Sequence, residues 1–278
     1  MNASERLRLP IVTCIVPCFN ESVDVLRLSL NSLIGQSFKN FECFVIDEST
    51  KEKTSEECRK ICQSDSRFFY INPERRLGLA GSLNIGLKRA NGKFIARFDS
   101  DDICKVDRLS LQVKFFDDHP DIDVLGGAME IIDSTGRITG CRDYPLEHMS
   151  IEKKFAFTNA MAHPTIMFRK SILEGLKGYD SSFRYSEDLE LWLRSLNQGF
   201  KFANLPNVLI SYRQQTSSRL KENWSFNLRA RTKNLSSRYF FRKALGILLI
   251  GGWSFFPTNL QQPLFKLLNI RKFNSNDK

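Results

Sequence analysis

Residues Lys93–Asp102 read KFIARFDSDD. Their apolar half predicts a short buried strand, and Asp99, Asp101 and Asp102 follow where that strand ends. Because side chains alternate along extended backbone, we expect Asp99 and Asp101 to point the same way. Carboxylates this close repel one another, and their hard oxygen atoms suit Mg²⁺ or Mn²⁺. The stretch therefore predicts a divalent metal site; the alternative interpretation is that the acids only cap the next helix.

Three further apolar runs precede this stretch and alternate with helical patterns. The expected strands are residues 11–16, 41–46 and 68–71, and the expected helices are residues 22–35, 55–63 and 78–90. This alternation predicts an α/β fold with a mostly parallel sheet and right-handed crossovers. Ligands of such sheets bind beyond the carboxyl ends of the strands. Glu21, Asp47 and Glu48 also follow strand ends, so we expect them to lie near the three aspartates.

The chain after Asp102 has a more mixed pattern. It contains neither a Gly-x-Gly-x-x-Gly motif nor a P-loop, which argues against a classical dinucleotide-binding fold and a P-loop kinase. Residues 140–158 show no clear period. The predicted helices are residues 106–118 and 170–176, and the predicted strands are residues 122–132, 161–168 and two short segments of 202–212 separated at Pro206.

A second acidic motif opens a predicted helix at residues 186–193, SEDLELWL. Ser186 is a favourable N-cap residue, and Glu187 and Asp188 occupy the first turn. Acidic side chains stabilise a helix N-terminus electrostatically, so a purely structural role is one interpretation. The other is that Asp188 is a general base held near the metal site, where the helix N-terminus keeps it ionised.

The basic character of the chain is concentrated in its last part. The formal net charge is +10, and from Arg213 onward there are 13 Lys and Arg residues against two Asp and Glu residues. We expect a helix at residues 223–245 and an uncharged apolar run at 244–256, which is too short to span a bilayer. Flanking cations and aromatics favour an anionic membrane surface over nucleic acid as the partner. A helical hairpin packed on the main domain is the alternative.

The cysteine pattern points to a reducing compartment. Seven cysteines are present, an odd number, and their spacing lacks the second ligand pair that a zinc site needs. We therefore predict buried free thiols in a protein of the cytosol. No apolar run precedes Ile11, so we predict no signal peptide.

Seven segments, in order, resemble family 2 glycosyltransferases of the GT-A fold. The resemblance covers about residues 10–215, which we take as the transferase domain, with residues 216–278 as a basic, partly apolar helical tail. The segments are IVPCFNES (15–22), FVIDEST (44–50), GLAGSLNIGLKRANGKFIARFDSDD (78–102), AHPTIMFRK (162–170), LKGYD (176–180), SEDLELWLR (186–194) and NVLISYRQQ (207–215). Where the family often has Asp-Gly after the first acid of the second segment, this chain has Glu48-Ser49.

The resemblance implies a role for each matched residue. Asp101 and Asp102 would hold Mn²⁺ or Mg²⁺ against the donor diphosphate, and Asp188, with Glu187, would be the catalytic base. Residues implied to contact the nucleotide are Pro17, Phe19, Asn20, Glu21, Asp47, Glu48 and Asp99. Weaker candidates for acceptor or diphosphate contacts are His163, Tyr179, Trp192 and Arg213.

The implied activity is inverting transfer of a hexose, with galactose or glucose favoured, from a UDP-sugar to a hydroxyl of a lipid-linked sugar. An acceptor such as N-acetylglucosamine-diphospho-undecaprenol would place the reaction in bacterial O-antigen or polysaccharide synthesis, with a β-linked product. The enzyme would be cytoplasmic and peripheral on the inner face of the inner membrane, without a nucleic-acid partner. The alternatives are a polyprenyl-phosphate hexose synthase and a non-enzymatic basic membrane-binding module.

Overall fold

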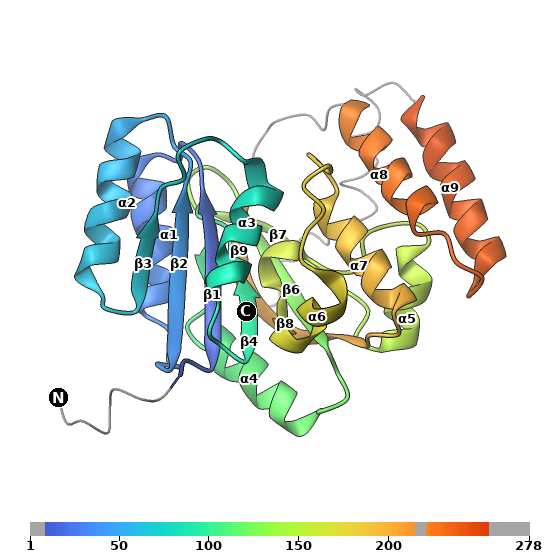
Figure 1. Ribbon diagram of the computed structural model, residues 1–278, viewed down its shortest axis with the longest axis horizontal. Coiled ribbons are helices and arrows are strands. Elements are labelled where there is room, and N and C mark those ends of the chain that lie inside the picture. Colours follow the sequence, from blue (N-terminus) through green and yellow to red (C-terminus); the bar gives the residue numbers. More distant parts are fainter. Residues whose placement is uncertain (1–8, 215–220, 256–278) are drawn as a thin grey trace.

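A twisted central sheet with helices packed around it forms the body of the protein (Figure 1). The computed structural model describes residues 9–214 and 221–255. The strands are β1 (Val12–Cys18), β2 (Phe41–Asp47), β3 (Phe68–Ile71), β4 (Phe94–Arg97), β5 (Ile103–Cys104), β6 (Val124–Ile132), β7 (Ile138–Arg142), β8 (Met167–Arg169) and β9 (Phe202–Arg213). The α-helices are α1 (Val23–Ile34), α2 (Glu52–Ser64), α3 (Gly78–Arg89), α4 (Arg108–Asp118), α5 (His148–Phe155), α6 (Leu173–Leu176), α7 (Glu187–Asn197), α8 (Lys221–Lys233) and α9 (Phe240–Ser254).

The first half of the sheet has the predicted parallel arrangement. Its order is β3-β2-β1-β4, and every neighbouring pair in it is parallel. Helix α3 lies close against β1 because residue 86 is glycine: a Cβ there would lie 2.5 Å from a methyl carbon of Ile15. The other half is mixed, since β8 runs antiparallel to both β4 and β6, whereas β9 runs parallel to β6. The α/β fold with carboxyl strand ends at one edge is thus confirmed.

Two strand predictions in the second half are wrong. Residues 161–168 do not form one strand, because His163–Thr165 is a 3-10 turn and only Met167–Arg169 pairs with the sheet. Strand β9 is continuous through Pro206. Its register against β6 shifts after Gly127, so that Pro206 falls in a bulge where no ladder N–H is needed.

The single predicted helix of residues 223–245 is also wrong. It is divided into α8 and α9, and Tyr239 adopts a left-handed conformation (φ 56°) directly before α9. The two helices lie side by side at one end of the molecule, next to α7 (Figure 1). Ala230 of α8 is fully buried and Gly246 of α9 lies against the carbonyl of Ala156. The hairpin therefore packs on the rest of the described protein, as in the alternative interpretation of the tail.

Residues 140–158, which had no clear period, contain the end of β7 and the whole of α5. All seven cysteines are free, six of them buried, which confirms the prediction of buried thiols. Within residues 9–214 and 221–255, no helix has both the length and the apolarity needed to cross a bilayer.

Candidate active site

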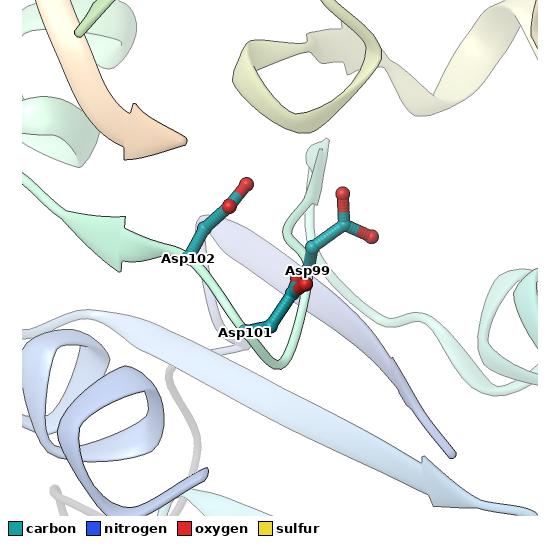
Figure 2. Close-up of side chains that lie close together, drawn as sticks. All are labelled: Asp99, Asp101 and Asp102. Atoms are coloured by element: carbon teal, nitrogen blue, oxygen red, sulfur yellow. The ribbon is translucent and has the colours of Figure 1, made fainter. Parts of the chain in front are cut away.

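The three aspartates after β4 form a compact carboxylate cluster (Figure 2). One carboxylate oxygen from each of Asp99, Asp101 and Asp102 lies within 4.8 Å of the others. The expectation that Asp99 and Asp101 lie on extended backbone was wrong. Strand β4 ends at Arg97, and the aspartates lie in a turn. The turn brings the side chains of Asp99 and Asp101 together from one side and that of Asp102 from the other.

Two arginines contact the cluster: Arg97 binds Asp99, and Arg213 binds Asp101 and Asp102. Asp99 forms an ion pair with the buried guanidinium of Arg97, through a hydrogen bond of 2.6 Å. The Oδ1 atom of Asp102 accepts the backbone N–H of Arg213 at 2.8 Å, and Arg213 Nε donates to the carbonyl of Asp101 at 3.1 Å. Arg213 at the end of β9 thus holds the turn in place.

Asp102 is the residue that best fits a metal ligand. It is fully buried, and its Oδ2 atom has no hydrogen-bond partner among the described residues. Burial, together with the charges of Asp99 and Asp101, raises the pKa of the Asp102 carboxyl well above its usual value. A buried, unpartnered oxygen amid like charges is costly unless a cation is bound. The cluster therefore fits Mn²⁺ or Mg²⁺.

The loop after β1 is connected to the cluster by Glu21. Its Oε1 atom accepts the hydroxyl of Ser100 at 2.7 Å, and its Oε2 atom accepts the N–H of Phe19 at 2.9 Å. Asn20 has a left-handed backbone (φ 63°), and its side-chain oxygen accepts the N–H of Thr50 at 2.9 Å. These bonds bring the ends of β1 and β2 beside the acidic turn, as predicted. Pro17 is half-buried within β1.

The two acids after β2 are held by internal hydrogen bonds. Asp47 is fully buried and accepts the Tyr70 hydroxyl and the Ser49 N–H, both at 2.9 Å. Burial and this carboxylate raise the pKa of Tyr70 to about 12. Glu48 accepts Leu77 N–H at 3.1 Å, Gly78 N–H at 3.0 Å and Ser82 Oγ at 2.6 Å, so it caps the start of α3.

Phe19 and Arg76 form an aromatic surface near the loop after β1, and only Phe19 was among the predicted nucleotide contacts. Phe19 is 38% exposed, and the guanidinium carbon of Arg76 lies 3.8 Å from the centre of its ring. Arg76 comes from the loop between β3 and α3, and no regular sequence period marks it. An Arg–aromatic pair of this kind presents a flat face to solvent.

Asp188 lies at the start of α7 and faces a cleft. Its Oδ2 atom accepts from Asn159 Nδ2 at 2.6 Å, and its Oδ1 atom accepts the N–H of Leu189 at 2.7 Å. Ser186 precedes the helix as predicted, but its backbone is left-handed (φ 58°) and its side chain makes no cap hydrogen bond. The capping expectation for Ser186 is therefore wrong, and Asp188 itself accepts a hydrogen bond from the first turn.

Glu187 belongs to a buried polar chain behind Asp188. Burial, and then the charge of Asp188, raise the pKa of Glu187 to about 8. Its Oε1 atom lies 3.8 Å from His163 Nδ1, and His163 Nε2 is hydrogen-bonded to the Tyr179 hydroxyl at 2.9 Å. Burial and the Arg97 charge lower the pKa of His163 well below its usual value. This chain supports the start of α7 from inside the protein.

The cleft that Asp188 faces has a volume of about 1350 Å³. Asn159 and Tyr212 line it, and α8 and α9 contribute Trp224 and Trp253. Burial, together with the charges of the three clustered aspartates, raises the pKa of Tyr212 to about 12. Tyr212 thus lines the cleft that contains Asp188 and is close enough to the carboxylate cluster to be affected by its charges. By contrast, Trp192 is fully buried, so its ring has no surface for a ligand.

Comparison with known protein families identifies the family of this chain. The profile described as Glycosyl transferase family 2 matches residues 13–176, more than half of the chain. The chain is a member of glycosyl transferase family 2. Among its relatives, the O-antigen biosynthesis glycosyltransferase WbnJ of Escherichia coli is 30% identical over 243 residues, which are 82% of this chain and 92% of WbnJ.

Solved structures show the fold of this glycosyltransferase. Residues 1–349 of TarS from S. aureus, in complex with UDP-GlcNAc, superpose with a TM-score of 0.67 at 20% identity, covering 92% of this chain and 75% of that one. The mannosyltransferase PcManGT of Pyrobaculum calidifontis, in complex with GDP-Man and Mn²⁺, has a TM-score of 0.59 at 16% identity, covering 94% and 81%. The GT-A fold is therefore confirmed.

The site of the glycosyltransferase also contains residues that the sequence patterns did not single out. Arg97, Asn159 and Tyr212 all contact or adjoin the acidic residues described above. Asn159 directly follows the stretch that had no clear period. The sequence signals for two of these residues were weak. Arg97 is a charged residue in an otherwise apolar strand, and Tyr212 comes two positions after the buried strand residue Ile210.

Proposed function

We propose that this protein transfers a hexose from a UDP-sugar to a hydroxyl of a lipid-diphosphate-linked sugar, with a β-linked product, in the assembly of a bacterial surface polysaccharide such as O-antigen. The observation that carries the proposal is the placement of Asp188 in a cleft whose wall, Tyr212, adjoins the three clustered aspartates. The name of the Escherichia coli relative supports the pathway, and the UDP-GlcNAc complex of TarS supports the nucleotide.

On the donor side, Asp101 and Asp102 would hold the divalent cation. The cation supplies positive charge where negative charge develops on the departing diphosphate. Arg97 forms an ion pair with Asp99, and Arg213 holds the backbone of the turn. The carboxylate oxygens are therefore positioned before the substrate binds. Preorganisation of this kind is a large part of catalysis by charged groups.

On the acceptor side, Asp188 would remove the proton from the attacking hydroxyl. Asn159 orients one carboxylate oxygen of Asp188. Burial, and then the charge of Asp188, raise the pKa of Glu187 to about 8, which favours the protonated form of Glu187 beside Asp188. A single displacement with the base on one face and the leaving group on the other inverts the anomeric carbon.

The nucleotide would bind beyond the ends of β1 and β2. Phe19 and Arg76 present a flat surface suited to a base, and we assign Pro17 and Asn20 to the same pocket. We assign Glu21, Asp47 and Glu48 to the same pocket, where their internal hydrogen bonds fix the loops. Asp99 would lie on the ribose side.

A donor screen tests the proposed function directly. UDP-, GDP- and dTDP-hexoses are supplied with Mn²⁺ and a synthetic lipid-diphosphate acceptor, and the product is analysed by mass spectrometry and NMR. We expect transfer from a UDP-hexose and a β-linked product. Transfer only to plain polyprenyl phosphate would favour a polyprenyl-phosphate hexose synthase instead, and failure to bind any nucleotide-sugar would favour a non-enzymatic binding module.

We also propose that α9 rests on the cytoplasmic membrane surface. Phe241, Leu245 and Leu248 are spaced four and three residues apart and are exposed, Phe241 by 86%. Arg238 and Arg242, both exposed, flank this apolar stripe at its start. Cations beside an exposed apolar stripe complement an anionic lipid surface. Helix α9 is at the end of the molecule opposite α2, and no helix or strand of the described residues lies on its outer side (Figure 1).

Replacing the stripe should weaken membrane binding. We expect Phe241→Ser combined with Leu248→Ser to lower the affinity for vesicles containing anionic lipid by about tenfold or more, because each apolar side chain contributes about 1–2 kcal/mol when buried. Sedimentation with vesicles measures the effect. The control is Leu28→Ser, which removes an exposed leucine of α1. Equal sedimentation of the double variant and the wild type with vesicles would show that α9 is not the membrane contact.

A further inference from the structure

A buried arginine in the wall of the cleft has donor capacity that the fold does not use. Arg231 of α8 is 5% exposed and lines the cleft. Its Nε atom donates to Asn227 Oδ1 at 2.8 Å, and its Nη1 atom donates to the carbonyls of Phe155 and Ala156. Its Nη2 atom has no hydrogen-bond partner among the described residues. A buried cation of this kind favours an anionic ligand.

Four further cationic residues line the same cleft, and Lys154 and Arg142 are the two considered next to Arg231; the others are Arg76 and Arg184. Lys154, at the end of α5, is half-buried, with its Nζ atom 5.9 Å from the centre of the Tyr144 ring. Arg142, at the end of β7, is also half-buried. Burial, and then the charge of Arg142, lower the pKa of Lys154, so the two cations interact. Asp143, next to Arg142 in the sequence, also lines this cleft and is exposed.

Arg142, Lys154 and Arg231 line the same cleft as Asp188 and as residues of α9. The chain from Lys154 to Asn159 runs along the cleft, from the end of α5 to the residue that holds Asp188. Arg231 binds the carbonyls at the start of this segment. Leu249, Ile250 and Trp253 of α9 line the same cleft, and α9 also carries the exposed apolar stripe. One cleft therefore contains the proposed base, the cations and an apolar wall.

We propose that Arg142, Lys154 and Arg231 form a phosphate subsite that binds the phosphate groups of the lipid-linked acceptor. The proposal rests on the function proposed above and deepens it, because it names the part of the acceptor that the cations recognise. With the acceptor sugar at Asp188, its phosphate groups lie against the cations and its lipid chain leaves along α9. The donor diphosphate is served by the separate carboxylate cluster, which is acidic and needs a cation.

The test compares two acceptors that carry the same sugar, one on an alkyl diphosphate and one on a neutral alkyl glycoside. Lys154→Gln should raise KM for the diphosphate acceptor by about tenfold, the effect of losing one charge-assisted hydrogen bond. KM for the neutral glycoside and for the UDP-sugar should stay the same. Lys153→Gln, which changes the adjacent exposed lysine outside the cleft, is the matched control. Arg231→Lys, which keeps the charge with fewer donors, should show the same selective effect.

Equal KM values for Lys154→Gln and the wild type on the diphosphate acceptor would overturn the proposal. So would a rise in the KM of the UDP-sugar, because the cations would then serve the donor. A titration with an alkyl diphosphate in EDTA, followed by tryptophan fluorescence of the full chain, gives a readout that does not depend on transfer. If the wild type transfers to neither acceptor, the proposed function fails, and this titration still decides the phosphate subsite: about tenfold weaker binding by Lys154→Gln supports it, and equal binding overturns it.

Discussion

Asp188→Asn is expected to lower kcat by about 10²–10⁴-fold while leaving the binding of the UDP-sugar unchanged. The amide is the same size as the carboxylate, and its oxygen can still accept from Asn159, whose Nδ2 atom lies 2.6 Å from the present Oδ2 atom; the amide NH2 group replaces the oxygen that accepts the N–H of Leu189. It cannot take a proton from the acceptor hydroxyl. Steady-state kinetics with saturating donor and acceptor measure the loss, and calorimetry measures donor affinity.

Asp107→Asn is the matched control for this variant. Asp107 also precedes a helix, α4, but it is exposed and makes no side-chain cap hydrogen bond. It should retain wild-type kcat. A kcat for Asp188→Asn close to that of the wild type would show that another group accepts the proton. A loss of donor affinity in Asp188→Asn, without a change in kcat, would instead place this carboxylate in the donor site.

Asp102→Asn is expected to have opposite effects on activity and on stability. Activity with saturating Mn²⁺ should fall by roughly 10²–10³-fold, because one metal ligand and its charge are lost. In the absence of metal, Tm should rise by about 2–4 °C, because three carboxylates within 4.8 Å repel one another and one of them becomes neutral. The amide oxygen can still accept the N–H of Arg213, so the turn remains anchored.

Thermal unfolding with and without Mn²⁺ separates the two effects. Mn²⁺ should raise Tm of the wild type and have a much smaller effect on Asp102→Asn, since binding to the folded state stabilises it. Asp117→Asn, an exposed acid of α4, should behave as the wild type in both measurements. If Mn²⁺ raises Tm of Asp102→Asn as much as that of the wild type, Asp102 is not a ligand.

The parallel half of the sheet could be predicted because its signals are local. Each of β1 to β4 is a short apolar run with its own boundaries, and the helices between them indicate parallel strands, whereas the order β3-β2-β1-β4 is known only from the structure. The errors occur where partners distant in sequence decide the local structure. Strand β9 passes through Pro206 because β6 pairs on both sides of the bulge. The tail divides into α8 and α9 where the hairpin turns back to pack on the rest of the described protein.

The sequence by itself determined the acidic residues and their order along the chain, from Glu21 to Asp188, because each follows a strand end or begins a helix. Only the tertiary structure decided what each carboxylate is available for. Asp47 and Glu48 are engaged by Tyr70 and by the start of α3, whereas one oxygen of Asp102 is left without a partner. The reason is physical: the hydrogen bonds that occupy or spare an oxygen come from residues far along the chain. Arg213, 111 positions after Asp102, is the clearest case.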